Sequence, residues 1–182
     1  MVAAAEAQEI LRAAELLCPA DAVTRAVQRL AAEITSALAP ANPLVLCVMS
    51  GAVVFMGQLL PLLEFPLEVD YVHLTRYGDA TVGGRTEWKM FPAAKIAGRA
   101  VLIVDDILDE GHTLAEIRRR VLEAGASKFY AAVFADKAIG RAKPIAADFV
   151  GITLPDRYVF GFGLDVRGAW RNLPAVYAMK QE

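Results

Sequence analysis

The chain has 182 residues, enough for one domain with a complete hydrophobic core, so we expect a single domain over residues 1–182. Hydrophobic residues make up 56% of the sequence and charged residues 22%, as in a soluble globular protein. The formal net charge of -2 argues against a general binder of nucleic acid or anionic membranes, because such proteins carry a basic surplus. Any site for phosphate groups is therefore expected to be local.

Segments for targeting or cross-linking are not predicted. No stretch reaches 18 uncharged apolar residues, and Glu6 and Glu9 lie where a signal peptide needs a basic start, so we expect a cytoplasmic protein. Cys18 and Cys47 both have apolar neighbours and lack the spacing of a disulfide framework or a zinc site. We expect both thiols to be reduced and structural.

Two helices without distinctive motifs are predicted first. Apolar residues at helical spacing indicate one helix over residues 3–17, which Cys18 and Pro19 end, and a second from about residue 21 to residue 38. An apolar run over residues 44–49 then predicts a buried strand, followed by a helix over about residues 53–63. Ser50 and Gly51 form the turn between them, which alone would indicate only a tight turn.

A long connection is predicted after the next strand, which covers residues 69–75. Residues 76–95 contain Gly78, Gly83 and Gly84 and show no clear period. Connections of this length are uncommon in compact domains unless they are lids or binding loops. An ordinary exposed hairpin is the alternative.

The most informative stretch is residues 101–113. Its first four residues are aliphatic and mostly β-branched, which predicts a strand buried on both faces, and this strand ends in Asp105 and Asp106. Asp109 follows, and residues 110–113 open a helical pattern that Gly125 is expected to end. Backbone N–H groups at such a turn can hold a phosphate, and the acid pair can bind hydroxyl groups or a divalent cation.

Two other interpretations fit part of this stretch. The acids could be solvated side chains at the edge of an ordinary strand–loop–helix connection. A phosphoacceptor receiver domain also places acids at strand ends, but it needs an acidic metal-binding cluster near the N-terminus, which the sequence lacks.

Further strands are predicted at about residues 129–134, 149–152 and 176–179. The order of elements predicts an α/β fold with a mainly parallel central sheet flanked by helices, and a small hood formed by the remaining short strands. Functional residues are expected at the carboxyl ends of the parallel strands.

Residues 101–113 resemble the phosphoribosyl-pyrophosphate (PRPP) binding motif of the type I phosphoribosyltransferases. Lys137, the run Pro155-Asp156-Arg157-Tyr158-Val159, Asp165 and Arg171 narrow the resemblance to the hypoxanthine-guanine branch. It extends from about residue 44 to residue 179. It implies a purine-salvage transferase that moves 5-phosphoribosyl from PRPP to N9 of hypoxanthine or guanine, giving IMP or GMP and pyrophosphate. It also implies Mg²⁺ as cofactor and a homodimer or homotetramer, with no nucleic-acid or membrane partner.

The resemblance also implies roles on the PRPP side of the site. Asp105 and Asp106 would engage the ribose hydroxyls, directly or through Mg²⁺, and the Asp165 carboxylate would help hold a second Mg²⁺. Arg171 and the backbone of Ser50 and Gly51 would bind pyrophosphate. The 5′-phosphate would be held by Glu110, Gly111, His112 and Thr113.

On the base side, Asp109 would act as the acid or base at purine N7. Lys137 would donate to the 6-oxo group, and Tyr158 would stack on the ring. The backbone of Val159 and the carbonyl of Asp165 would meet the N1/N2 edge. Tyr77, in the connection expected to form a lid, would close over the substrates.

The sequence departs from the resembled branch at three places. The turn after the first strand often carries a cis non-proline peptide in that branch, here Met49–Ser50, and Ser50 replaces the usual lysine. His112 occupies a loop position that varies among relatives, and its side chain need not matter because its backbone N–H would bind the phosphate. Arg157 replaces a lysine of some relatives and is expected to face solvent or a phosphate.

Two rival functions stay open at the level of sequence. One is a phosphoribosyltransferase that prefers xanthine or another base, because one lysine does not settle selectivity. The other is a non-catalytic regulator that keeps the fold, senses nucleotides and binds RNA, against which the near-neutral charge and the presence of Asp109 count.

Overall fold

The computed structural model describes residues 2–77 and 85–180. Its centre is a six-stranded sheet in the order β4-β3-β2-β5-β6-β7, in which only the β3–β4 pair is antiparallel. The predicted α/β fold with a mainly parallel sheet is therefore confirmed. The strands are β2 (Leu44–Met49), β3 (Glu68–Tyr77), β4 (Arg85–Met90), β5 (Ala100–Leu108), β6 (Lys128–Ala138) and β7 (Phe149–Pro155).

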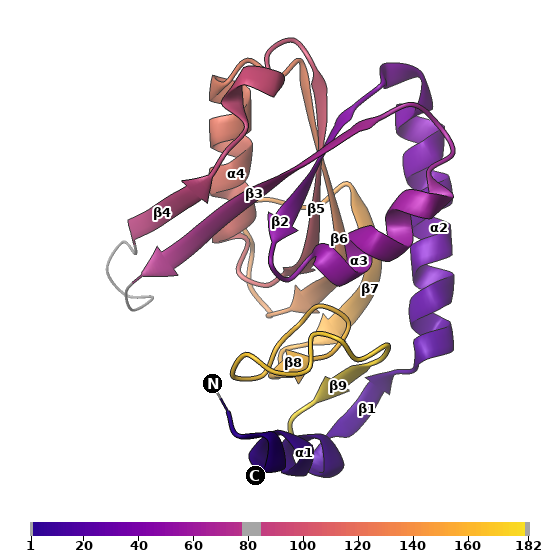
Figure 1. Ribbon diagram of the computed structural model, residues 1–182, viewed down its shortest axis with the longest axis vertical. Coiled ribbons are helices and arrows are strands. Elements are labelled where there is room, and N and C mark those ends of the chain that lie inside the picture. Colours follow the sequence, from indigo (N-terminus) through magenta and orange to yellow (C-terminus); the bar gives the residue numbers. More distant parts are fainter. Residues whose placement is uncertain (1, 78–84, 181–182) are drawn as a thin grey trace.

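Helices cover both sides of this sheet. Figure 1 shows α4 (His112–Glu123) on one side and α2 (Ala20–Leu38) with α3 (Val53–Leu59) on the other. The last turns of the helix predicted over residues 53–63 are a 3₁₀ segment, Leu60–Leu62, which contains Pro61 near its start. Further 3₁₀ segments are Ala39–Ala41 and Ala93–Lys95. None of the described helices is both long and apolar enough to cross a membrane.

A smaller three-stranded sheet forms the predicted hood, in the order β1-β9-β8. Its strands are β1 (Glu15–Cys18), β8 (Val159–Phe160) and β9 (Val176–Ala178), and α1 (Ala4–Ala13) lies beside it at the same end of the molecule (Figure 1). The prediction of one helix over residues 3–17 is wrong at its C-terminal end. β1 pairs there with β9, a partner about 160 residues away that no local pattern reveals.

The connection predicted over residues 76–95 contains a strand. β4 pairs with β3 as a hairpin, with Thr75 opposite Glu87, and this agrees with the alternative of a hairpin. Trp88 on β4 packs against Phe91, and the guanidinium of Arg120 on α4 lies 4.4 Å from the centre of the Trp88 ring. Residues 78–84, the middle of the expected lid, lie outside the described residues.

Both cysteines are free and buried, as the sequence predicts. Burial raises the pKa of the Cys18 thiol. Burial, together with the nearby Asp105 and Asp106, raises the pKa of Cys47 to about 12. Since the thiolate is the reactive form, these environments suit structural thiols.

Candidate active site

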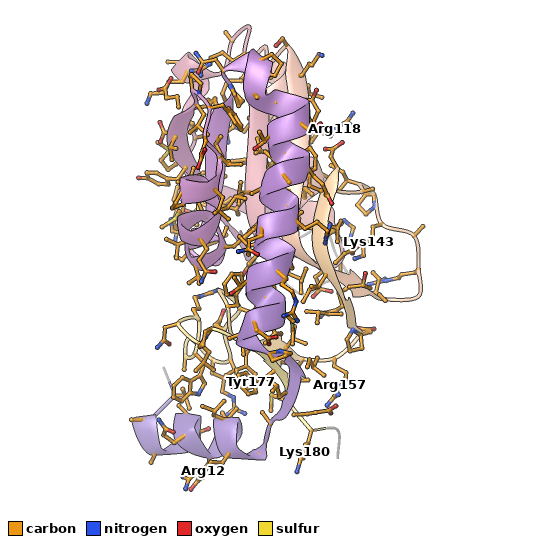
Figure 2. All side chains as sticks on the ribbon, turned by 90° about the vertical axis from the view of Figure 1, so that its right-hand side faces the viewer. Arg12, Arg118, Lys143, Arg157, Tyr177 and Lys180 are labelled. Carbon is orange, nitrogen blue, oxygen red and sulfur yellow. The ribbon has the colours of Figure 1, made fainter. Side chains whose placement is uncertain are left out.

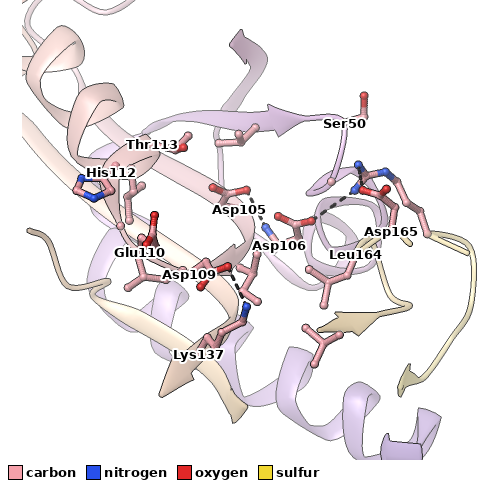
Figure 3. Close-up of a pocket in the computed structure, with 18 of the residues that line it drawn as sticks. Ser50, Asp105, Asp106, Asp109, Glu110, His112, Thr113, Lys137, Leu164 and Asp165 are labelled. Atoms are coloured by element: carbon pink, nitrogen blue, oxygen red, sulfur yellow. Dashed lines mark hydrogen bonds and ion pairs between the residues drawn. The ribbon is translucent and has the colours of Figure 1, made fainter. Parts of the chain in front are cut away.

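The carboxyl ends of β2, β5 and β6 open into one cavity of about 530 Å³ (Figure 3). With one exception, every site residue expected from the sequence lines it: Ser50, Gly51, Asp105, Asp106, Asp109, Glu110, Gly111, His112, Thr113, Lys137, Tyr158, Val159, Asp165 and Arg171. The exception is Tyr77, whose side chain lies outside the described part of the chain. The cavity wall also includes residues not singled out from the sequence: Val48, Met49, Ile107, Leu108, Leu114 and Leu164. Most of them are neighbours of expected residues, which is the only signal that could have found them.

Asp105 and Asp106 lie within β5, which continues past them to Leu108. Asp105 is buried, and its Oδ1 accepts a hydrogen bond of 2.9 Å from the N–H of Asp106. Burial and the neighbouring carboxylate hold the pKa of Asp105 well above its usual range, and burial also raises the pKa of Asp106. A cation or a hydroxyl donor placed here would stabilise the charged forms.

Two turns, one at Gly51 and one at Gly163, come into close contact beside this acid pair. A Cβ atom on Gly51 would overlap the carboxylate of Asp106, so any other residue at this position would displace the Asp106 side chain. A Cβ on Gly163, which has a φ of +99°, would overlap the carbonyl oxygen of Gly51. The Met49–Ser50 peptide in the first of these turns is cis, as the resemblance implies.

Asp109 and Lys137 form an ion pair across the cavity floor, with 2.9 Å between Oδ2 and Nζ (Figure 3). The Lys137 side chain is 13% exposed and comes from β6, whereas Asp109 is half exposed. The pair places a carboxylate that can carry a proton next to a cation that can only donate hydrogen bonds. An ammonium and a protonated carboxyl can each donate a hydrogen bond, so the pair suits a ligand edge that carries two adjacent acceptor atoms.

The N-terminus of α4 forms one end of the cavity. Gly111 caps the helix with a φ of +85°, and among the described residues no side chain bonds to the first-turn N–H groups. These N–H groups have no partner within the helix and, with the helix dipole, favour an anion. Thr113 adds a hydroxyl, and Glu110 pairs with Arg141. In Figure 3 the acid pair lies between this turn and the group formed by Ser50 and Asp165.

The opposite wall belongs to the hood. Arg171 pairs with Asp165 at 2.5 Å and lies 3.7 Å from Oδ2 of Asp106. Its guanidinium also donates to the carbonyl of Gly163 at 2.5 Å. Tyr158 is 54% exposed, and its hydroxyl lies 3.5 Å from the carbonyl oxygen of Asp165. An exposed aromatic ring at a cavity mouth can receive a planar ligand.

Contacts from the N-terminal segment fix this wall from behind. The indole N–H of Trp170 donates to the carbonyl of Ala7 in α1 at 2.7 Å. Arg157 donates to Glu15 at 2.7 Å and to the carbonyl of Met179 at 2.9 Å. The expectation that Arg157 faces solvent or a phosphate is therefore wrong, because its guanidinium instead joins β1 to the end of β9.

Comparisons with known proteins agree with this site. Residues 17–167 match the family described as phosphoribosyl transferase domain. The chain is 33% identical over 169 residues to a hypoxanthine-guanine phosphoribosyltransferase of Streptococcus pneumoniae, covering 92% of this chain and 94% of that relative. Solved structures are also similar to it, among them two phosphoribosyltransferases. A hypoxanthine phosphoribosyltransferase from Staphylococcus aureus superposes with a TM-score of 0.85 at 26% identity over 91% of each chain. A hypoxanthine-guanine-xanthine phosphoribosyltransferase gives a TM-score of 0.77 at 31% identity, over 92% of this chain and 94% of that one.

The motif in residues 101–113, the fold and these relatives all agree. The chain belongs to the phosphoribosyl transferase family, in the branch of the hypoxanthine-guanine phosphoribosyltransferases.

Proposed function

We propose that this protein transfers the 5-phosphoribosyl group of PRPP to N9 of hypoxanthine or guanine, giving IMP or GMP and pyrophosphate in purine salvage. The observation that carries the proposal is the Asp109–Lys137 pair, which faces the same cavity as the acid pair and the N-terminus of α4. One cavity thus offers groups for a base, a ribose and phosphates. Transfer from a pyrophosphate leaving group needs this proximity, since most of the barrier is lowered by placement and charge.

The base is recognised at its six-membered ring and at N7. O6 and N7 of an oxopurine are adjacent acceptors on one edge, so a base that binds between Lys137 and Asp109 replaces their ion pair with two contacts of its own. Lys137 donates to O6, and Asp109 holds or accepts a proton at N7, easing loss of the N9 proton. Tyr158 stacks on the ring, and the backbone of Val159 and the Asp165 carbonyl meet the N1/N2 edge.

PRPP is held at the two ends of the cavity. Asp105 and Asp106 engage the ribose hydroxyls, whose contact favours the ionised carboxylates. Arg171, together with the backbone of Ser50 and Gly51, binds the pyrophosphate, and Tyr77 closes over the substrates. The 5′-phosphate is bound by the N–H groups and side chains of Glu110, Gly111, His112 and Thr113.

Magnesium is the proposed cofactor, and the acid pair suits it. Within residues 2–77 and 85–180, no group of three or more His, Cys, Asp or Glu side chains could hold a metal ion. Mg²⁺ usually binds through one or two carboxylates together with waters and substrate phosphates, which fits Asp105 and Asp106. The Asp165 carboxylate would bind a second Mg²⁺ only after its ion pair with Arg171 is broken. Bound Mg²⁺ would shield the charge of the leaving pyrophosphate.

We also propose a single-domain cytoplasmic enzyme that assembles as a homodimer or homotetramer and has no nucleic-acid or membrane partner. The net charge of -2 supports the last part.

The test is incubation of the purified protein with PRPP, Mg²⁺ and each of hypoxanthine, guanine, xanthine and adenine, with detection of nucleotide and pyrophosphate. We expect nucleotide from hypoxanthine and guanine and none after chelation of the metal. Nucleotide from xanthine alone would favour the xanthine-preferring enzyme, and no nucleotide from any base would favour the non-catalytic regulator.

Lys137→Ala tests the base site directly. A buried ammonium without an acceptor disfavours adenine, whose 6-amino group cannot accept its bond, by about 10⁴-fold or more in kcat/KM. Lys137→Ala should remove most of the efficiency with oxopurines and narrow their advantage over adenine. If the unmodified protein uses adenine as well as hypoxanthine, the base site is assigned wrongly.

A further inference from the structure

Lys143 places a buried ammonium at the point where β5 and β6 separate. It lies in the connection between β6 and β7, does not line the cavity, and belongs to no motif. Its Nζ donates to the carbonyl oxygens of Leu108 and Lys137, each at 2.6 Å, and to the carboxylate of Asp136. Figure 2 shows it beside the strand ends, away from the end of the molecule that holds Arg157 and Tyr177.

The ammonium of Lys143 is fully hydrogen-bonded within the protein. An ammonium group has three N–H donors, and here each has an acceptor. The Lys143 side chain is only 12% exposed, so water cannot readily replace a lost partner. The three acceptors are therefore held at a fixed mutual distance.

Two of these acceptors are main-chain carbonyl oxygens at or next to residues with a proposed role in the reaction. Leu108 directly precedes Asp109, and Lys137 carries the ammonium that pairs with Asp109. The paired register of β5 and β6 ends at Leu108 and Asp136, after which β6 continues beside β7 only. Lys143 therefore bridges β5 and β6 at their last paired residues, directly before Asp109 leaves β5 and beside Lys137, which stays in β6 next to β7.

The same connection also supports the neighbouring turn. A Cβ placed on Gly111 would lie 3.2 Å from Pro144 and 3.4 Å from the Cβ of Lys143. Arg141 pairs with Glu110, although both side chains are partly exposed. The contacts of Lys143 thus belong to a segment that packs along the whole turn from Leu108 to Gly111.

We propose that Lys143 is a positioning residue that sets the separation of Asp109 and Lys137 without touching the substrates. This inference rests on the roles of Asp109 and Lys137 under the proposed function. Misplacement of a reacting group by about 1 Å can cost on the order of 100-fold in rate. The effect of losing Lys143 therefore falls on turnover with the base. PRPP binds almost as before, because the three bonds of the Lys143 ammonium go to Leu108, Asp136 and Lys137 and not to the groups proposed to hold PRPP.

The experiment compares Lys143→Met with Lys128→Met. The first variant keeps an unbranched apolar chain and removes the ammonium, and the second removes an exposed ammonium at the other end of β6. Lys143→Arg is a third variant, which keeps a cation able to reach some of the acceptors. For each, kcat and the KM of PRPP and of hypoxanthine are measured per folded protein, together with amide hydrogen exchange in residues 105–114 and 134–140.

We expect Lys143→Met to lower kcat about 10- to 100-fold, with the KM of PRPP changed less than about twofold. Exchange in both segments should become faster, Lys143→Arg should lose less, and Lys128→Met should behave as the unmodified protein. A kcat within about twofold for Lys143→Met, or equal losses in kcat and PRPP affinity, would overturn the proposal. Absence of transferase activity in the unmodified protein would refute the proposed function instead, and the exchange data would still decide whether Lys143 joins the two segments.

Discussion

The two walls of the cavity are built in different ways. On one side, the acid pair, Asp109 and the phosphate turn all come from residues 105–113, a continuous piece of chain that runs from the end of β5 into the first turn of α4. On the other side, Tyr158, Asp165 and Arg171 lie on a hood that depends on residues near the N-terminus. The bonds from Trp170 to Ala7 and from Arg157 to Glu15 each connect residues more than 140 positions apart.

This difference explains which wall local sequence patterns reveal by themselves, whereas the hood residues Tyr158, Asp165 and Arg171 were expected only from the resemblance to a known family. A buried strand, a glycine turn and a helix N-terminus are local features, and their order in residues 105–113 already specifies the side chains that converge. The hood has no such local code, because its position is set by pairing between distant segments. Substitution of a single side chain in residues 105–113 should therefore impair the first wall. The second wall should be impaired by loss of the contacts that join the hood to the N-terminal segment.

Asp109→Asn should give the largest effect and tests the first wall. Loss of the proposed proton carrier is expected to lower kcat by about 10²–10⁴. The fold should remain, because Asp109 is half exposed and its ion pair with Lys137 is partly solvated. Steady-state kinetics and direct PRPP titration measure this, and affinity for PRPP should change far less. Near-normal turnover would reject the role of Asp109.

Gly51→Ala disturbs the place where the two walls meet. The added methyl group would overlap the Asp106 carboxylate, and relief of this overlap should cost about 1–3 kcal/mol of unfolding free energy. Displacement of Asp106 should also weaken PRPP binding. Gly57→Ala is the matched control, since nothing lies within 4 Å of its Cβ and it lies inside α3, so about 0.5–1 kcal/mol of stabilisation is expected. Urea unfolding compares the two, and equal effects would contradict the contact.

Asp105→Asn should change how stability depends on pH. The pKa of Asp105 is raised in the folded protein by burial and by Asp106, so the native state holds a proton that unfolding releases. Its contribution to stability is complete below the pKa of the unfolded chain and is lost as pH rises through the raised pKa. Asparagine cannot ionise, and its carbonyl oxygen can still accept the N–H of Asp106.

The stability of Asp105→Asn relative to the unmodified protein should therefore increase from pH 5 to pH 8, measured by urea unfolding without Mg²⁺ or PRPP. A difference that does not change with pH would show that Asp105 is not protonated in the native state at these pH values. Transferase activity should fall in the same variant, since the proposed ribose contact weakens.

Trp170→Phe tests the second wall and should give the smallest effect. It removes the bond to the Ala7 carbonyl while keeping a large ring, at a cost of about 0.5–1.5 kcal/mol in unfolding free energy. Trp88→Phe is the comparison, because its indole N–H bond to Glu116 is 3.4 Å long and should contribute less. No loss of stability for Trp170→Phe would mean that the bond to Ala7 does not anchor the hood.

The strengths and errors of sequence-based prediction follow the same division. β2, β5 and α4 were predicted because their apolar patterns and end residues are local, and Gly125 indeed follows α4 with a φ of +86°. β1 was missed because Glu15-Leu16-Leu17 also suits a helix and its partner β9 is distant. Lys143 could not be found, because a single lysine before a proline in a loop is normally solvated.

One consequence concerns the tolerance of α1 to substitution. The bond that Trp170 makes is to the main-chain carbonyl of Ala7, which any residue would present in the same helical turn. The only side-chain bond from α1 to the hood loop, among the residues described, is that of Glu6 to Arg167, and both partners are largely exposed. An amphipathic helix of this length with a small residue at the buried position of Ala7 could therefore take the place of α1, so this segment can serve the site with almost no recognisable signature in its sequence.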